Sequence, residues 1–293
     1  MIFDWFRDHH RKELLEQPFP PEWLPILNRD MGHYAYLTEE ERARLHADLR
    51  IFAAEKNWEG CAGLDVTEEM KVTISAQACL LLLNLEHNYF ANVETILIYP
   101  TTYVAKERAI GPDGVVDEGP STRLGEAWQE GPVILSWFDV KAGGMNELDG
   151  HNVVLHEFAH KLDLGDGAVD GVPRLENETQ YERWSEVMSA EYERLVENAE
   201  KGHATLLDRY GATNAGEFFA VATECFFEKA RQMRDRHPEL YDVLASYYRQ
   251  DTAARMDAHM AAQHAQSEHA HDEHKHGNHA HEENRHGEHA HRH

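Results

Sequence analysis

Apolar residues in the first third of the chain recur at helical spacing. Thr38 and Glu41 have the form of a capping box, and an amphipathic stretch follows them through Phe52. Thr67 can cap a second helix that runs to about Tyr89 and turns one apolar face inward, with Met70, Ile74, Ala78, Leu81, Leu82 and Leu85. The pattern therefore predicts that the first third of the chain is largely helical.

Two short runs rich in β-branched and aromatic residues come next. They span Thr95 to Val104 and Pro132 to Val140, and a Gly- and Pro-containing loop from Gly111 to Pro120 lies between them. We expect both runs to be strands of one small mixed sheet. At the sheet edge over a cleft, the second strand can hold a substrate backbone by strand addition, whereas an interior strand contacts no ligand.

Helical patterns return in the second half of the chain. Three helices are predicted at about His151 to Leu162, Glu178 to Lys201 and Ala215 to Met233. A fourth begins with Pro238 in its first turn and runs to about Arg249. No internal repeat is visible, so the order of elements predicts a single α+β domain with helices on both sides of a small sheet in the sequence.

The composition changes sharply near Asp257. Of 22 histidines, 10 fall in residues 1–258 and 12 in residues 259–293. The apolar residues of this tail are alanines and one methionine, which cannot offset the entropy of ordering. We predict a folded body at 1–258 and a disordered His-rich tail at 259–293.

Paired histidines in the tail can bind divalent metal ions, and they include His269 with His271, His274 with His276 and His279 with His281. Two interpretations remain open for this segment. It can serve the protein by buffering metal, or it can be solvated low-complexity sequence whose metal binding has no role.

The charge and the cysteines exclude several classes of protein. A formal net charge of −25 argues against a duplex nucleic-acid binder, which needs clustered cations. The three cysteines lie far apart without a CxxC pair, which fits a reducing cytoplasm. The N-terminus lacks an apolar signal region, and the run Ala78 to Leu83 is far short of the roughly 20 residues that span a bilayer. We expect a cytoplasmic protein without direct nucleic-acid or membrane contact.

The segment from His156 to His160 fits the HExxH pattern. Its two imidazoles lie one helical turn apart and can bind one Zn²⁺ ion, and Glu157 then projects beside the metal. Apolar neighbours from Val153 to Leu162 predict a buried helix, where His and Glu are costly unless they bind a metal or pair. We interpret the motif as a catalytic zinc site rather than a chance match.

A catalytic zinc site needs a third protein ligand, and His203, Glu217, Glu224 and Asp163 are candidates. Glu217 opens a helix that is apolar nearly all round and is predicted to be buried, so its carboxylate requires a cation. Asn214 followed by Glu217 also matches an N-cap with Glu at the third helical position, and capping alone can explain Glu217. Sequence spacing leaves both interpretations open.

Several strings, taken in order from about Leu24 to Arg249, resemble the Mlc titration factor A family of zinc metallopeptidases. They are Ile-Leu-Ile-Tyr-Pro at 96–100, Gly-Glu-Ala-Trp at 125–128, Gly-Pro-Val-Ile-Leu-Ser-Trp at 131–137, His-Glu-Phe-Ala-His-Lys-Leu-Asp at 156–163, and Tyr-Gly-Ala-Thr at 210–213 with Glu-Phe-Phe-Ala-Val at 217–221. Together these strings are far more specific than HExxH alone.

The resemblance implies a gluzincin-type site in a zincin-like fold. His156, His160 and Glu217 would bind zinc. Glu157 would be the catalytic base, and the Tyr210 hydroxyl would stabilise the transition state. The resemblance also implies a cytoplasmic bacterial protein with aminopeptidase-like activity. Such a protein binds the glucose repressor Mlc and relieves the repression of glucose phosphotransferase genes. The His-rich tail departs from the family pattern, so the resemblance implies nothing about it.

Each implied role has a physical reason. Zinc polarises a bound water and the scissile carbonyl, while Glu157 takes the proton of the water and passes it to the leaving amine. The Tyr210 hydroxyl can donate a hydrogen bond to the developing oxyanion, although an ordinary packed loop tyrosine fits the same position. Asp163 can accept a proton from a zinc-binding imidazole, or it can be a surface carboxylate at a helix C-terminus.

The sequence therefore predicts a zinc-dependent, aminopeptidase-like enzyme that also titrates a repressor. One alternative is a non-catalytic repressor-binding module with a structural or vestigial zinc, and another is a metal-handling protein that uses its tail. The intact Glu157 favours the enzyme, because a structural site has no use for a general base. The buried HExxH helix argues against a protein that only handles metal.

Overall fold

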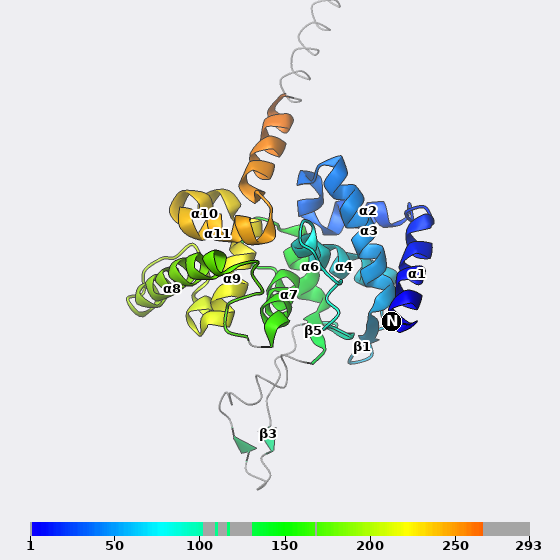
Figure 1. The fold of residues 1–293 in the computed structure, drawn as a ribbon, viewed down its shortest axis with the longest axis horizontal. Coiled ribbons are helices and arrows are strands. Elements are labelled where there is room, and N and C mark those ends of the chain that lie inside the picture. Colours follow the sequence, from blue (N-terminus) through cyan, green and yellow to red (C-terminus); the bar gives the residue numbers. More distant parts are fainter. Residues whose placement is uncertain (1, 102–108, 111–115, 118–130, 168, 266–293) are drawn as a thin grey trace, which may run out of the picture. The chain divides into compact units, whose positions relative to one another are not determined.

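The computed structural model describes residues 2–101, 109–110, 116–117, 131–167 and 169–265 (Figure 1). The chain divides into two compact units, Met1–Thr252 and Ala253–His293. In the second unit, residues 253–265 are helical. The rest of the predicted tail lies outside the described residues, and so do the string at 125–128 and most of the predicted Gly- and Pro-containing loop.

Helices make up the beginning of the first unit, as predicted. They are α1 (Ile2–Glu16), α2 (Trp23–Asp30), the 3-10 helix η1 (Gly32–Tyr36), α3 (Glu39–Glu55) and α4 (Glu68–Leu82). The capping box at the start of α3 is confirmed, because Thr38 accepts from the Glu41 amide and Glu41 from the Thr38 amide. The Thr67 side chain likewise caps α4. Helix α4 ends before the predicted Tyr89, and every residue at 72–83 is buried.

A small parallel sheet follows these helices in the chain. It consists of β1 (Asn57–Gly60), β2 (Thr95–Tyr99) and β5 (Val133–Ser136) in the order β1-β2-β5. The three strands of this sheet run parallel, so the predicted mixed sheet is corrected, since α4 crosses over between β1 and β2. A separate antiparallel pair joins β3 (Ala109–Ile110) to β4 (Val116–Asp117). Among the described strands, β5 is an edge strand and not an interior one.

The second predicted strand is wrong beyond Ser136. The chain turns there into α6 (Trp137–Met145), because the Ser136 hydroxyl accepts a hydrogen bond from the Asp139 amide at 3.3 Å and caps a helix. The apolar residues that resembled a strand therefore lie on the first turn of a helix. Helix α6 contacts α4 and the helix that carries the HExxH motif.

The helices of the second half match the predicted positions closely. They are α7 (Val153–Asp163), η2 (Leu164–Asp166), α8 (Glu178–Glu200), η3 (Arg209–Ala212), α9 (Ala215–Glu228), α10 (Ala230–Arg236) and α11 (Pro238–Tyr248). The predicted helix at 215–233 is two helices, because the Lys229 backbone leaves the helical region at φ −116° and ψ 34°. Within the described residues, no helix has both the length and the apolar run that a bilayer crossing requires.

Helix α7 is anchored in the core by contacts with α4 and α9. Its Phe158 is fully buried, and its ring centroid lies 5.6 Å from that of Phe52 and 4.7 Å from that of Phe90. Helix α9 is buried along nearly its whole length, including Phe218, Phe219, Phe226 and Phe227. The two helices therefore hold their facing side chains in fixed positions, which is the condition for a precise site.

Candidate metal centre

The start of α7 is fixed by Asn152. The Asn152 side-chain oxygen accepts hydrogen bonds from the amides of Val154 and Leu155, both at 3.1 Å. One face of α7 is buried in the core through Val154, Leu155, Phe158 and Ala159, whereas His156, Glu157 and His160 are only partly buried on the other. Capping and packing therefore aim the three residues of the motif away from the core.

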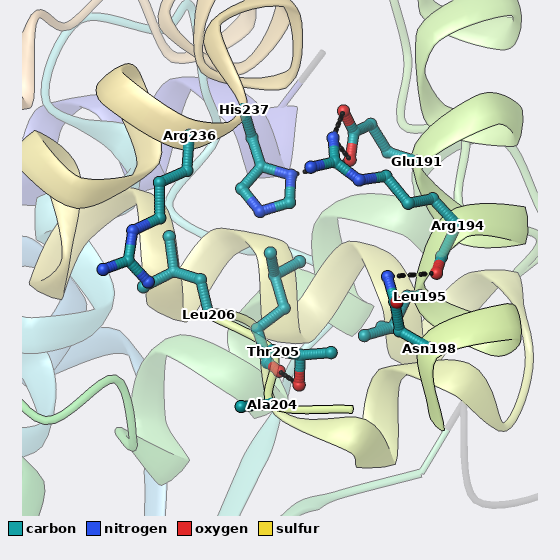
Figure 2. Close-up of a pocket in the computed structure, with 10 residues that line it drawn as sticks. Glu191, Arg194, Leu195, Asn198, Ala204, Thr205, Leu206, Arg236 and His237 are labelled. Atoms are coloured by element: carbon teal, nitrogen blue, oxygen red, sulfur yellow. Dashed lines mark hydrogen bonds and ion pairs between the residues drawn. The ribbon is translucent and has the colours of Figure 1, made fainter. Parts of the chain in front are cut away.

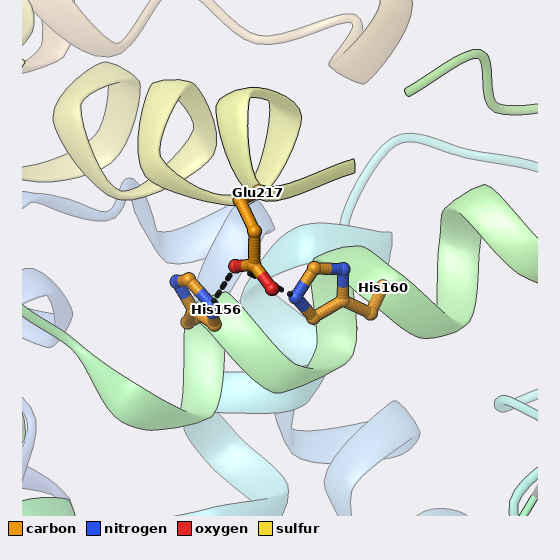
Figure 3. A group of neighbouring side chains, drawn as sticks. All are labelled: His156, His160 and Glu217. Carbon is orange, nitrogen blue, oxygen red and sulfur yellow. Dashed lines mark hydrogen bonds and ion pairs between the residues drawn. The ribbon is translucent and has the colours of Figure 1, made fainter. Parts of the chain in front are cut away.

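Glu217 lies opposite this face, on the first turn of α9. The Asn214 side chain accepts a hydrogen bond from the Glu217 amide at 2.9 Å, so the capping interpretation holds for the Glu217 backbone. The Glu217 side chain turns instead toward α7 (Figure 3). Its Oε2 lies 3.1 Å from Nε2 of His156 and 3.4 Å from Nε2 of His160. The cap and the side-chain position are compatible, and the role of Glu217 as a metal ligand stays a prediction.

The separations of these atoms suit a zinc ion. One ligand atom from each of His156, His160 and Glu217 lies within 4.8 Å of the other two. Tetrahedral zinc with bonds of about 2.0 to 2.2 Å keeps its ligand atoms about 3.3 Å apart, close to the 3.1 and 3.4 Å observed. Two imidazole nitrogens and one carboxylate oxygen are also the donor set of a catalytic zinc site, which leaves a fourth position open.

The electrostatics of the group favour a bound cation. Burial raises the pKa of Glu217, but hydrogen bonds with His156 and His160 outweigh it and lower that pKa to about 2. Burial lowers the pKa of His156, but hydrogen bonds with Glu217 and Glu224 raise it to about 10. A proton on His156 thus occupies the position that a metal would take, and the two compete for the same nitrogen.

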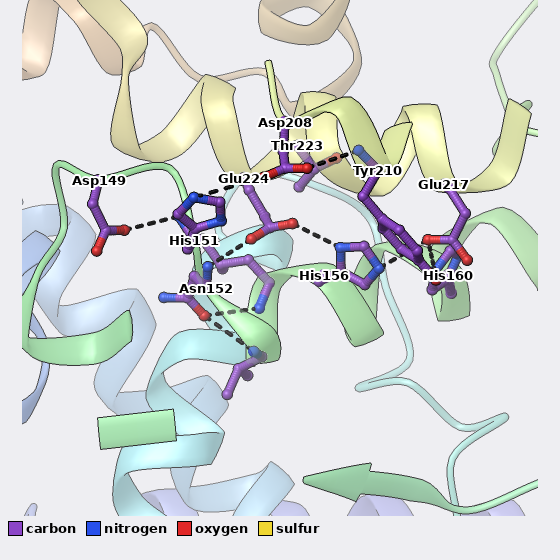
Figure 4. A network of polar contacts seen from close by, with 12 residues as sticks. Asp149, His151, Asn152, His156, His160, Asp208, Tyr210, Glu217, Thr223 and Glu224 are labelled. Atoms are coloured by element: carbon purple, nitrogen blue, oxygen red, sulfur yellow. Dashed lines mark hydrogen bonds and ion pairs between the residues drawn. The ribbon is translucent and has the colours of Figure 1, made fainter. Parts of the chain in front are cut away.

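Glu224 is not part of the ligand group, although the sequence made it a candidate. Its Oε1 lies 2.7 Å from Nδ1 of His156, and its Oε2 accepts a hydrogen bond from the Asn152 amide at 2.6 Å (Figure 4). It therefore orients the His156 ring so that Nε2 faces Glu217. The sequence reasoning missed this role. The signal is the seven-residue spacing from Glu217, which puts both carboxylates on one face of α9.

The other two candidates for the third ligand lie elsewhere. His203 is exposed, and its Nδ1 lies 3.2 Å from the side-chain oxygen of Asn198. Asp163 is fully buried, so the expected surface carboxylate is wrong. Its Oδ2 accepts a hydrogen bond from the Gly171 amide at 2.8 Å, because the following loop returns over the end of α7.

Asp163 retains a free acceptor near the histidines. Burial raises its pKa to about 6, and His160 lies close enough to oppose that rise. Neither Oδ1 of Asp163 nor Nδ1 of His160 has a hydrogen-bond partner among the described residues, although both atoms are buried. The proton-accepting role that the sequence suggested for Asp163 stays a prediction.

Tyr210 and Glu157 lie beside the ligand group. Tyr210, on η3, is 55% exposed, so it is not a packed core tyrosine, and its ring centroid lies 6.0 Å from that of His156. The Asp208 side chain accepts from the Tyr210 amide at 2.7 Å and fixes the backbone there. Burial and the Glu217 carboxylate raise the pKa of Tyr210 to about 12, so its hydroxyl keeps its proton. Burial also raises the pKa of Glu157.

The chain is similar to proteins of one metallopeptidase family along most of its length. A sequence profile of the family described as glucose-regulated metallo-peptidase M90 matches residues 5–249. An uncharacterized protein of Synechocystis is 42% identical over 243 residues, which cover 82% of this chain and 88% of that relative. Proteins named Mlc titration factor A are 32% identical over 225 residues in Edwardsiella ictaluri and 30% over 233 in Serratia proteamaculans. These matches cover 76% and 78% of this chain, and 85% and 88% of the two relatives.

The family match and the relatives agree with the strings that pointed to Mlc titration factor A, so that resemblance is confirmed. The HExxH helix and Glu217 both fall inside the matched residues. The family description also agrees with a group of side chains able to hold a metal ion. The chain therefore belongs to the glucose-regulated metallopeptidase M90 family.

Proposed function

We propose that this protein is a zinc-dependent peptidase of the zincin type, with the aminopeptidase-like specificity that the family resemblance implies. The observation that carries the proposal is the convergence of His156, His160 and Glu217, whose ligand atoms lie within 4.8 Å of one another. Glu157 lies on the same helix and takes no place in that group, so it is available for chemistry. A purely structural zinc has no need of such a residue.

Each side chain of the site has a separate role in the proposed peptide hydrolysis. A zinc ion held by His156, His160 and Glu217 would polarise the attacking water and the scissile carbonyl. Glu157 takes a proton from the water and returns it to the leaving amine. The Tyr210 hydroxyl donates a hydrogen bond to the oxygen on which negative charge develops, and this bond strengthens as the charge grows.

The edge position of β5 supports an extended substrate. The outer edge of β5 is not paired with another described strand, and β5 contacts α7, which carries the motif. An extended peptide can pair with such an edge, so we propose that short or unstructured peptides are the substrates. A folded protein offers such a strand only at an exposed sheet edge, so it is a poorer substrate for this mode of binding.

The test compares three states of the same protein. Turnover of a peptide library is measured for the zinc-loaded protein, after removal of metal with a chelator, and after zinc is restored. We expect turnover to disappear with the metal and to return with it. Peptides with acetylated N-termini are cleaved poorly if the enzyme is an aminopeptidase. Turnover that persists in the metal-free protein would refute the proposal.

We also propose that the protein binds a repressor of the Mlc type. The support is the name Mlc titration factor A, which its relatives in Serratia proteamaculans and Edwardsiella ictaluri carry. A cytoplasmic location follows from such a partner. Purified repressor should be retained by both the wild type and Glu157→Gln, because titration of a partner needs no bond cleavage. Recovery of repressor with neither form would remove this part of the proposal.

A further inference from the structure

A hollow lies away from the metal ligands. It has a volume of about 320 Å³ and lies between the second half of α8, the loop at 204–207 and the junction of α10 with α11 (Figure 2). None of its lining residues belongs to the group that can hold zinc. Cavities that bind small molecules begin at about 300 Å³, so this one suits a small ligand.

The carboxylate of Glu191, which lines the hollow, is paired with two basic side chains. Oε2 of Glu191 lies 2.7 Å from Nδ1 of His237, and Oε1 of Glu191 accepts from the Arg194 guanidinium at 3.1 Å. Burial raises the pKa of Glu191, but the hydrogen bond with His237 and the charge of Arg194 outweigh it and keep that pKa low. The carboxylate is thus held as an anion by its two partners and does not repel another anion.

A cation remains available on the wall of the hollow. Arg236 lines the hollow, and its guanidinium forms no ion pair or hydrogen bond with any described side chain. Figure 2 shows the second ring nitrogen of His237, Nε2, turned toward the space between Arg236 and Thr205. The chain has a net charge of −25, so a guanidinium in a hollow without an acidic partner is unusual. Such a group can bind an anion.

Three leucines contribute the apolar part of the wall, beside the polar side chains of Asn198 and Thr205. Leu195, Leu206 and Leu207 line it together with Arg236. A guanidinium binds carboxylate or phosphate through two parallel hydrogen bonds, and leucine side chains favour an apolar neighbour. We propose that this hollow binds a small organic anion whose carboxylate or phosphate head contacts Arg236 and whose apolar part packs against Leu195 and Leu206.

One loop connects the hollow to the metal centre. Arg209 donates a hydrogen bond to the carbonyl of His203 at 2.8 Å, and the Thr205 hydroxyl donates to the carbonyl of Leu207 at 2.8 Å. These bonds tie the loop that begins at the hollow and ends at Tyr210, whose ring lies 6.0 Å from that of His156. Thr205 also lines the hollow, so we expect a ligand there to alter the position of Tyr210 and the rate of hydrolysis, an effect that rests on the proposed peptidase function.

The binding step is tested by titration calorimetry on the full-length, zinc-loaded protein at pH 8. The probes are butyrate, butyl phosphate and inorganic phosphate, with butylamine as a ligand of opposite charge. We expect saturable binding of butyrate or butyl phosphate, and no binding of butylamine. The stronger of the two anions identifies the head group. Inorganic phosphate that binds as tightly as butyl phosphate would overturn the apolar part of the proposal.

Two variants locate the site. Arg236→Gln should weaken binding of the anion at least tenfold, and Arg231→Gln, on the same helix but outside the hollow, should bind it as the wild type does. Arg236 is exposed, so its replacement leaves the core intact, and equal melting temperatures verify this. Equal affinity in all three proteins, or no saturable binding to the wild type, would overturn the proposal.

The connection to Tyr210 is tested separately. Saturating anion should change kcat in the wild type and in Arg231→Gln, and should leave kcat unchanged in Arg236→Gln. Binding without any change in kcat would overturn the connection but not the site. If the protein hydrolyses no peptide, the proposed function fails, while the calorimetric titration still decides whether the anion binds.

Discussion

Glu228 provides a sharp test of the packing that supports the metal centre. It lies at the end of α9, is fully buried, and neither of its carboxyl oxygens has a hydrogen-bond partner among the described residues. Burial raises its pKa to about 9, and the nearby charges of Asp149 and Glu224 add to the rise. Asn152, which caps α7, lies close enough to oppose it. Glu228 is therefore protonated at neutral pH.

The sign and size of the effect follow from proton linkage. An unfolded glutamate loses its proton near pH 4.5, whereas folded Glu228 keeps its proton up to about pH 9. Between these values the folded state binds one more proton, so the free energy of unfolding falls by about 1.4 kcal/mol per pH unit. The loss from pH 6 to pH 8 amounts to about 3 kcal/mol. Glutamine does not titrate, so Glu228→Gln removes this slope.

Urea unfolding at pH 6, 7 and 8 measures the effect. The free energy of unfolding of Glu228→Gln minus that of the wild type should rise by about 1.4 kcal/mol for each pH unit. Titrations shared by both proteins, including those of the metal centre, cancel in the difference. Glu200 is exposed, so the same difference measured for Glu200→Gln gives the effect of replacing a surface glutamate by glutamine. This control difference is subtracted from that of Glu228→Gln. A difference that stays constant from pH 6 to pH 8 would show that burial does not keep Glu228 protonated in this range.

Four further predictions concern the metal centre and the tail. Glu224→Gln should lower zinc affinity about 10- to 100-fold in a chelator competition, because His156 loses the partner that orients it; unchanged affinity contradicts that role. Tyr210→Phe should keep its zinc but lose about 100-fold in kcat, and an unchanged kcat argues against the oxyanion contact. In a chain ending at Ala258, Glu217→Ala should lower zinc occupancy; full occupancy with reduced stability alone would leave only capping to this residue. A chain ending at Ala258 should bind one zinc where the full chain binds more, and equal metal per chain would remove the predicted metal binding of the tail.

Elements with local signals could be predicted from the sequence. The capping box of Thr38 and Glu41 begins α3, and Pro238 begins α11, as each pattern indicated. The apolar run after Ser136 was ambiguous because its residues suit both a strand and a helix turn. The Ser136 cap decided for the helix. The interruption at Lys229 has no glycine or proline signal, so the helical pattern continued through it.

The residues of the metal centre also differ in how far local sequence patterns could predict their positions. The HExxH spacing is local and placed His156 and His160 on one face of α7. The contact with Glu217 depends on how α9 packs against α7, and spacing alone left it beside other candidates. The burial of Asp163 depends on a loop that returns to it at Gly171, which no local pattern announces.

The proposed hydrolysis depends on Glu157 as the base that activates water at a zinc ion. The most direct measurement determines zinc per chain and peptide turnover together for the wild type, Glu157→Gln and the exposed control Glu200→Gln. Glutamine keeps the shape of Glu157 and removes the base, so the variant should retain its zinc while turnover falls about 10²- to 10⁴-fold. The control should match the wild type in both quantities. Undiminished turnover in zinc-loaded Glu157→Gln would contradict the account.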